Sequence, residues 1–220
     1  MNSGILSSDL YARDTVTVAR ELIGCVLVSA AGGQTTSGRI VETEAYLGSD
    51  DPGSHAATRG ITKRNAVMYG PPGRAYVYFT YGNHHMLNFV TEPEGVAGAV
   101  LIRALEPVDG IDVMLRRRSA SRHSVSPLAV PDLANGPGKL AASLGIGLSV
   151  NGEPLDGSAT LSVFAPEGPV PAVATSGRIG LSAGHEAELR FYIEGDRHVS
   201  TARPGRRVPS RSKSRKVSPG

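Results

Sequence analysis

The stretch RIVETEAY, residues 39–46, has the alternating pattern of a β-strand but carries two carboxylates close together. Side chains of a strand point alternately to its two faces. The two sets are Ile40, Glu42, Glu44 and Tyr46 on one face and Val41, Thr43 and Ala45 on the other. At the roughly 7 Å between alternate residues, two carboxylates repel by about 2 kcal/mol at an effective dielectric near 20. A cation has to offset this repulsion, and Arg39 and Arg103 are the candidates.

The residues alone leave three interpretations of this carboxylate pair open. One Glu can be a general base that deprotonates a water while an Arg holds the other. Acids at positions 42, 44, 50 and 51, together with His55, can instead bind a hard cation such as magnesium or manganese, as in a nuclease. Glu42 can also be a surface acid on an edge strand. Spacing does not choose between Glu42 and Glu44 as the base.

The segments around this strand indicate an α+β domain. The predicted strands are 25–29, 38–46, 75–81, 99–105, 161–164 and 189–194, and the predicted helices are 15–22, 109–118 and 137–145. Residues 47–74 are rich in Gly, Pro, Asp and Asn and are expected to form a long loop. The first two strands form a hairpin and strict alternation of strand and helix is absent. The predicted fold is therefore a single α+β domain with a curved, mostly antiparallel sheet, a few short helices and a protruding β-hairpin.

Composition separates a domain from a basic tail. The chain has 220 residues and a net charge of +3, and residues 203–220 carry seven Lys and Arg without an acid, so residues 1–202 carry a net −4. We expect a domain over 1–202 and a disordered basic tail over 203–220. A single cysteine, Cys25, excludes an intrachain disulfide. No apolar run approaches the roughly 20 residues of a membrane span, so we expect a cytoplasmic protein.

Basic and aromatic residues are interleaved between Asp51 and Glu92, where no acid occurs. This segment holds the cations Arg59, Lys63, Arg64 and Arg74 and the tyrosines Tyr69, Tyr76, Tyr78 and Tyr81. Cations can follow phosphates and aromatic rings can stack on bases, so the mixture favours nucleic-acid binding. The alternative is a basic surface loop beside an ordinary strand. Tyr81 precedes Gly82 at a predicted hairpin tip, where an aromatic can act as a wedge in a base step.

Several blocks of the sequence, in this order, resemble a known family. They are RIVETEAYLGSDDPGSHA, TKRNAVMYGPPGRAYVYFTYGNHHMLN, VLIRALEPVDG, NGPGKLAASLGI and the pair RIGLS and LRFYIEG. Together they span about residues 7–200 and are similar to the alkyladenine (3-methyladenine) DNA glycosylases of animals and bacteria. One departure is Arg197-His198-Val199, where the family has a Trp.

The resemblance implies a role for each matching residue. Glu44 is then the base that activates water, Arg103 helps to hold that water, and Glu42 is a structural acid. The base pocket is formed by Tyr46, His55, Tyr78 and Asn88, of which Asn88 crowds the exocyclic amine of normal guanine. Tyr81 fills the space left by the extruded base. The expected DNA-backbone contacts are Arg59, Lys63, Arg64, Arg74 and Lys139; the last follows Gly136-Pro137-Gly138 at a predicted helix start, where free N–H groups can bind phosphate.

The implied protein is a monofunctional, monomeric, nucleoid-associated enzyme that needs no metal and no cofactor. It flips alkylated or deaminated purines (3-methyladenine, 7-methylguanine, hypoxanthine and ethenoadenine) out of double-stranded DNA and hydrolyses the N-glycosidic bond. Two rivals from other classes are a nonenzymatic binder of damaged DNA or RNA and a metal-dependent nuclease.

Overall fold

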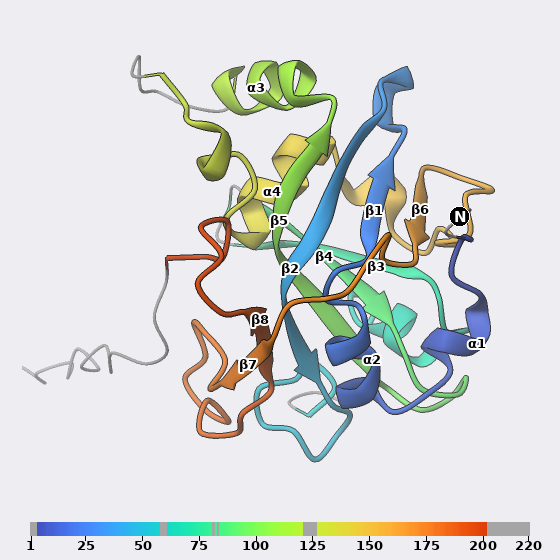
Figure 1. The fold of residues 1–220 in the computed structure, drawn as a ribbon. Helices are drawn as coiled ribbons and strands as arrows, with labels where there is room; N and C mark the ends of the chain where they lie inside the picture. The colour runs from blue at the N-terminus through green and yellow to red at the C-terminus, as the bar shows by residue number, and fades with distance from the viewer. Residues whose placement is uncertain (1–3, 58–60, 81, 83, 121–126, 202–220) are drawn as a thin grey trace, which may run out of the picture.

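The computed structural model describes residues 4–57, 61–80, 82, 84–120 and 127–201. It confirms the predicted fold class, because a single α+β domain is built on a curled antiparallel sheet (Figure 1). The strands are β1 Val26–Ser29, β2 Thr36–Tyr46, β3 Ala75–Thr80, β4 His84–Val90, β5 Ala99–Asp109, β6 Leu161–Phe164, β7 Val173–Ser176 and β8 Arg190–Ile193. The α-helices are α1 Ser8–Tyr11, α2 Thr15–Glu21, α3 Ile111–Ala120 and α4 Pro137–Leu144.

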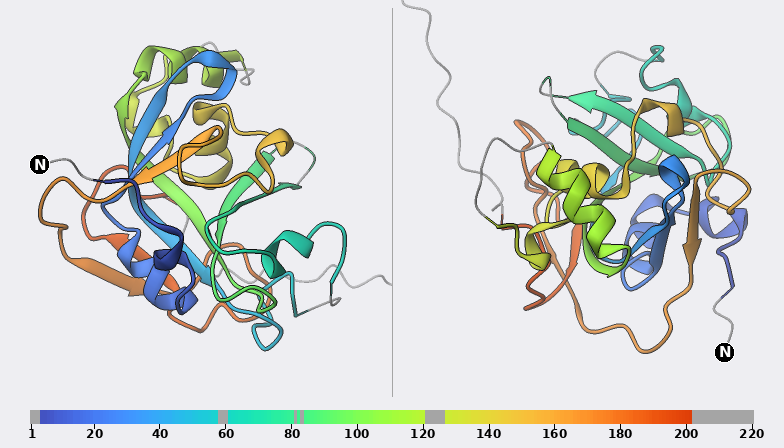
Figure 2. Two further views of the ribbon diagram at one scale, coloured as in Figure 1. Left: turned by 90° about the vertical axis from the view of Figure 1, so that its right-hand side faces the viewer. Right: turned by 90° about the horizontal axis from the view of Figure 1, so that it is seen from above.

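The sheet branches at β2, the strand that holds the carboxylate pair. Its main path runs β3-β4-β5-β2-β1-β6. One edge of β2 pairs with β5, whereas the other pairs with β1 over residues 36–39 and with β8 over residues 42–44. The short β7 then pairs with β8. Figures 1 and 2 show this β7–β8 arm and α1 on opposite sides of the molecule.

Strand alternation in β2 breaks near the carboxylates. The pairing with β5 shifts in register between Ile40 and Glu42 and again between Glu42 and Thr43. Ile40 and Val41 consequently both pack in the main hydrophobic cluster, whereas the sequence pattern put Ile40 on the face of Glu42. An irregular pairing of this kind redirects one side chain without ending the strand.

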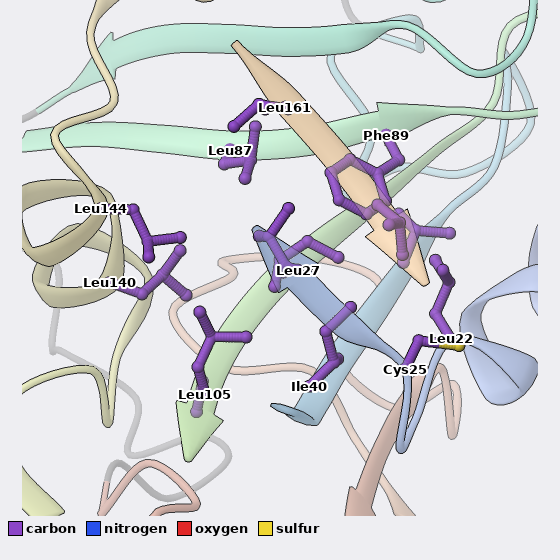
Figure 3. Close-up of a cluster of buried hydrophobic side chains, with 14 of the residues drawn as sticks. Leu22, Cys25, Leu27, Ile40, Leu87, Phe89, Leu105, Leu140, Leu144 and Leu161 are labelled. Carbon is purple, nitrogen blue, oxygen red and sulfur yellow. The ribbon is translucent and has the colours of Figure 1, made fainter. Parts of the chain in front are cut away.

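The core lies between the sheet, α2 and α4. Val18, Ala19 and Leu22 are fully buried at α2, which Asp14 caps by accepting a hydrogen bond from the Thr17 N–H. Figure 3 shows Leu27 of β1 at the centre of this cluster, with Leu87, Leu140 and Ile40 around it. The core therefore holds β1 and β2 between helices from both halves of the chain.

Most predicted elements are confirmed, and two strands were missed. The predicted helices correspond to α2, α3 and α4, and the six predicted strands to β1, β2, β3, β5, β6 and β8. β4 and β7 had not been assigned. β3 and β4 form the predicted hairpin at the free edge of the sheet, and the loop over 47–74 contains the 3₁₀ helix η2, Ala66–Tyr69. The end of the predicted domain, residue 202, and the predicted tail, 203–220, lie outside the described residues.

The longest helix among the described residues has ten residues, and none in that part of the chain combines the length and apolarity that crossing a bilayer requires.

The central place of Leu27 leads to a stability prediction. Leu27→Ala should lower the free energy of unfolding by about 2–5 kcal/mol, because it opens a cavity that the surrounding strands cannot close. Urea denaturation measures this loss. Leu148→Ala is the matched control, since Leu148 is 56% exposed and its truncation should change the free energy by about 0.5 kcal/mol or less. Equal losses for the two variants would contradict the assigned core.

Candidate active site

Glu42 is a fully buried structural carboxylate on the central strand β2, so its interpretation as a surface acid on an edge strand is wrong. Its Oε1 accepts hydrogen bonds from Arg103 Nε at 2.9 Å and Arg190 Nε at 2.6 Å. Ser200 donates its N–H to Oε2 at 2.7 Å and its hydroxyl to Oε1 at 2.8 Å. Two guanidinium groups and a serine thus satisfy a charge that burial would otherwise strongly disfavour.

Arg103 is the cation that the carboxylate pair requires. Besides bonding Glu42, its Nη1 lies 3.3 Å from Glu44 Oε2, so one guanidinium lies between the two acids. Burial alone would lower the pKa of Arg103, but the charges of Glu44 and Glu42 outweigh burial and raise that pKa. Arg39, the other candidate, instead pairs with Glu106 at 2.5 Å and lies 3.8 Å from Asp196.

Glu44 is equally buried but has different partners. Its Oε1 accepts the Ile179 N–H at 2.7 Å, and its Oε2 accepts the Tyr46 hydroxyl at 2.8 Å. Burial raises the pKa of Glu44 above its ordinary value, while Arg103 and the two hydrogen bonds oppose that rise. Two carboxylate oxygens can accept about four hydrogen bonds. Glu44 therefore keeps the capacity to accept one more, such as from a water.

A cavity of about 280 Å³ lies beside Glu44. Three partners of Glu44, namely Tyr46, Arg103 and Ile179, are part of its wall, although Glu44 itself is not. The rest of the wall is mainly aromatic and apolar and includes His55, Met68, Tyr76, Tyr78, Met86, Asn88, Leu101 and Pro137. The structure thus brings together all four residues expected in the base pocket, from β2, β3, β4 and the loop after β2.

One wall of the cavity is a packed group of rings. The His55 and Tyr78 ring centroids are 4.7 Å apart at an interplanar angle of 74°. His55 Nδ1 is 2.9 Å from the Tyr76 hydroxyl, and the guanidinium of Arg64 lies 4.7 Å from the Tyr78 ring centroid. Burial and then the Arg64 charge lower the pKa of His55, which favours the neutral imidazole. A neutral ring can stack on a base without adding charge to the cavity.

Asn88 is held rigidly in another part of the wall. It is 3% exposed and stands opposite Tyr76 in the β3–β4 pairing. Its Nδ2 donates to the Tyr76 carbonyl at 3.1 Å, which fixes the orientation of the amide. A fixed polar side chain of this kind can discriminate between ligands by contact with their edges.

The cations expected to contact DNA lie in different settings. Lys63 and Arg64 are exposed in the loop that also carries His55. Lys139 lies in the first turn of α4, two residues after Pro137 of the cavity wall, and donates to Asn135 Oδ1 at 2.6 Å. Arg74 donates from its Nη1 to the Gly152 carbonyl at 3.3 Å. Arg59 and the expected wedge Tyr81 lie outside the described residues.

Sequence reasoning missed the residues of the C-terminal part of the chain that bind the two carboxylates. Arg190 and Ser200 bind Glu42, and the Ile179 N–H binds Glu44, from positions more than 130 residues away. Asp51, one of the acids considered as a metal ligand, is bound by Arg178 through both carboxylate oxygens. Because guanidinium groups already engage Glu42, Glu44 and Asp51, the geometry disfavours the metal-dependent nuclease.

The departure at residues 197–199 is a packing difference. His198, in the middle of this stretch, is 6% exposed, and its Nδ1 lies 2.9 Å from Asp196 Oδ1. The group is separate from the cavity wall.

Fold and site together define an α+β protein with an aromatic cavity beside a buried, hydrogen-bonded carboxylate. Residues 9–197 match the family model described as methylpurine-DNA glycosylase (MPG), so the chain belongs to this family. It is thereby a DNA glycosylase, a base-excision repair hydrolase that acts on DNA.

Relatives align over nearly their whole length. A protein of Chlorobaculum parvum is 44% identical over 209 residues, which are 94% of this chain and 96% of the relative. Proteins of Methanoculleus marisnigri and Carboxydothermus hydrogenoformans are 48% and 46% identical, each over 89% of this chain and 98% of the relative. All three are provisionally named 3-methyladenine DNA glycosylases.

The buried network predicts that Glu42 supports stability. Glu42→Ala should lower the free energy of unfolding by about 3–5 kcal/mol, because it leaves Arg103 and Arg190 buried without their shared partner. Glu106→Ala is the control, since its pair with Arg39 is one-third exposed and should contribute about 1 kcal/mol or less. Urea denaturation compares the two variants, and a loss at Glu42 no larger than at Glu106 would contradict the network's role.

Proposed function

We propose that this enzyme flips alkylated and deaminated purines out of double-stranded DNA and hydrolyses their N-glycosidic bond with a water activated by Glu44. The proposed substrates are 3-methyladenine, 7-methylguanine, hypoxanthine and ethenoadenine. The observation that carries the proposal is the position of Glu44, a buried carboxylate whose partners Tyr46 and Arg103 form part of the aromatic cavity wall. The family and the names of the relatives support the same reaction.

The cavity suits an extruded purine. Tyr46 from β2 and the pair His55 and Tyr78 offer aromatic surfaces between which a flat base can stack. Each stack contributes roughly 1–3 kcal/mol. Flipping costs a few kcal/mol and least for a damaged or mispaired base, so two stacks can offset it. The same balance favours damaged over normal bases.

The chemistry follows from the arrangement around Glu44. A water that is held by both Arg103 and Glu44 donates a proton to the carboxylate while its oxygen attacks the anomeric carbon. The N-glycosidic bond breaks, and its electron pair leaves with the base. General-base assistance of this kind contributes typically 10² to 10⁴ in rate. A cationic alkylated purine leaves as a neutral base, whereas neutral hypoxanthine additionally requires protonation.

Selectivity against normal guanine is assigned to Asn88. Its amide is fixed by the hydrogen bond to the Tyr76 carbonyl and cannot easily turn away from the cavity. An exocyclic amine at this position would meet the Asn88 side chain, so guanine would fit less well than hypoxanthine, which lacks that amine.

DNA binding is assigned to five cations and to the hairpin tip. Lys63, Arg64, Arg74 and Lys139 are proposed to contact phosphates, together with Arg59, and Tyr81 to fill the vacated stack. We further propose a monomeric, nucleoid-associated enzyme of the cytoplasm, with its catalytic domain over residues 1–202 and a basic tail over 203–220 that adds salt-dependent affinity for DNA.

Replacing the proposed base tests the mechanism. Glu44→Gln should lower the single-turnover rate of release of 7-methylguanine from a duplex by about 10²- to 10⁴-fold, with lesion binding retained, because the amide cannot take a proton. Alkali-revealed abasic sites measure release. The reaction is run in EDTA, so a metal-dependent activity would be lost for wild type too.

The control for this variant is Glu21→Gln, an exposed carboxylate that pairs with Arg13. It should leave release unchanged within about twofold, as expected for a surface substitution. Undiminished release by Glu44→Gln would refute the assignment of the base. Binding without release by wild type on every tested lesion would favour the nonenzymatic binder.

Phosphate contact by Lys139 predicts a change in salt dependence. Lys139→Ala should weaken binding to any duplex and reduce the slope of log Kd against log salt by about 0.9, the value for one phosphate contact. Fluorescence anisotropy over a salt series measures the slope. Arg116→Ala is the control, because Arg116 is exposed on α3 and pairs with Asp112. An identical slope for wild type and Lys139→Ala would exclude the contact.

A further inference from the structure

Arg178 is a buried cation outside the cavity wall. Its side chain is 1% exposed, yet it lies in the segment between β7 and β8, whose other residues are all exposed or partly exposed. Both terminal nitrogens donate to Asp51, each at 2.6 Å, in the two-pronged geometry that makes guanidinium–carboxylate pairs strong. They also donate to the Ala45 and Gly184 carbonyls, each at 2.9 Å. One side chain thus joins β2, the loop after it and the segment before β8.

The guanidinium of Arg178 packs on the ring of Tyr46, which lines the cavity. Its central carbon lies 4.7 Å from the centroid of the Tyr46 ring. Tyr46 lines the cavity, whereas Arg178 is not among the lining residues. A guanidinium over an aromatic face restrains the ring and is attracted to it.

The residue after Arg178 reaches the proposed base. The Ile179 N–H donates to Glu44 Oε1, and Glu44 Oε2 accepts the hydroxyl of the same Tyr46. Because Arg178 and Ile179 are adjacent, any displacement of Arg178 moves the donor that orients Glu44. The stacking wall and the carboxylate therefore depend on one anchored segment.

The space around the pair is closed. A Cβ atom on Gly53 would lie 2.7 Å from Arg178 Nη2 and 2.8 Å from Leu181 Cδ1. On Gly184, which has a φ of +69°, it would lie 3.0 Å from the same nitrogen. A lysine cannot reproduce the flat two-pronged contact or the stacking. The surroundings are thus shaped around a guanidinium.

We propose that the Arg178–Asp51 pair is a positioning device that holds Tyr46 and Glu44 in their reactive arrangement, an inference that rests on the proposed function of the site. Neither residue touches the reacting atoms. The pair acts through the Tyr46 ring and the Ile179 N–H, and it sets how well the flipped base and the attacking water are aligned. Misplacement of a catalytic group by about 1 Å can cost about 10²-fold in rate.

The test compares Arg178→Lys and Asp51→Asn with wild type at a temperature where circular dichroism shows each variant folded. We expect the single-turnover release of 7-methylguanine to fall about 10- to 100-fold in both variants. Affinity for a duplex with a tetrahydrofuran abasic analogue, which offers no base to stack, should change by less than about threefold. A loss of release rate without a loss of affinity for the abasic analogue distinguishes misalignment of base and water from weaker general binding of DNA.

Arg117→Lys is the matched control. Arg117 is partly buried and, like Arg178, donates to two backbone carbonyls, those of Ala31 and Ser143, but it lies at the α3–α4 contact and not at the cavity. Its substitution should leave release within about twofold of wild type, even if the melting temperature falls as much as in Arg178→Lys. Unchanged release by folded Arg178→Lys, or a parallel loss of release and of affinity for the abasic analogue, would overturn the proposal.

A second readout does not depend on catalysis. Hydrogen exchange at the Ile179 amide should be slow in wild type and at least tenfold faster in Arg178→Lys, whereas Arg117→Lys should leave it unchanged. Equal protection in wild type and Arg178→Lys would overturn the positioning role. If wild type released no base while this difference in exchange was present, the proposed function would fail and the anchoring of the segment by Arg178 would stand.

Discussion

The structure depends on one guanidinium placed between two buried carboxylates. Arg103 bonds Glu42 at 2.9 Å and lies 3.3 Å from Glu44, and both acids are fully shielded from solvent. Without that cation, two charges on alternate positions of one strand would repel each other in a medium that screens them poorly. The remaining donors then give the acids different roles. Arg190 and Ser200 complete the hydrogen bonding of Glu42, whereas Glu44 can still accept one more hydrogen bond beside the cavity.

The branching of the sheet at β2 makes this arrangement possible. The N-terminal half of β2 pairs with β1 and supports the core, while the C-terminal half pairs with β8 and receives Arg190. The register shifts between β2 and β5 accompany the change from core-facing residues to site-facing residues. The ion pair between Arg178 and Asp51 links the segment that precedes β8 to the loop after β2. Residues from both ends of the chain therefore converge on one strand, and β2 links stability to the proposed chemistry.

Sequence patterns predicted the local features well. The helix α2, the β1–β2 hairpin and the start of α4 at Pro137 follow from periodicity and end signals. Arg103 was correctly among the candidate partners of the carboxylates, but nothing in the spacing excluded Arg39, because strand register is not encoded locally. β4 was missed because its first two residues are histidines and its polar Asn88 points into the cavity. Arg178 could not be predicted, since its contact with Asp51 spans 127 residues.

The most direct test of the account is the pH dependence of single-turnover release of 7-methylguanine, a cationic base that needs no further proton to leave. Burial raises the pKa of Glu44, and only the ionised carboxylate can accept a proton from water. Release should therefore fall tenfold per pH unit on the acid side, with a midpoint above the ordinary glutamate pKa of about 4.3. A rate that stays constant from pH 8 to pH 4, or an acid limb that persists in Glu44→Gln, would contradict the assignment of Glu44 as the base.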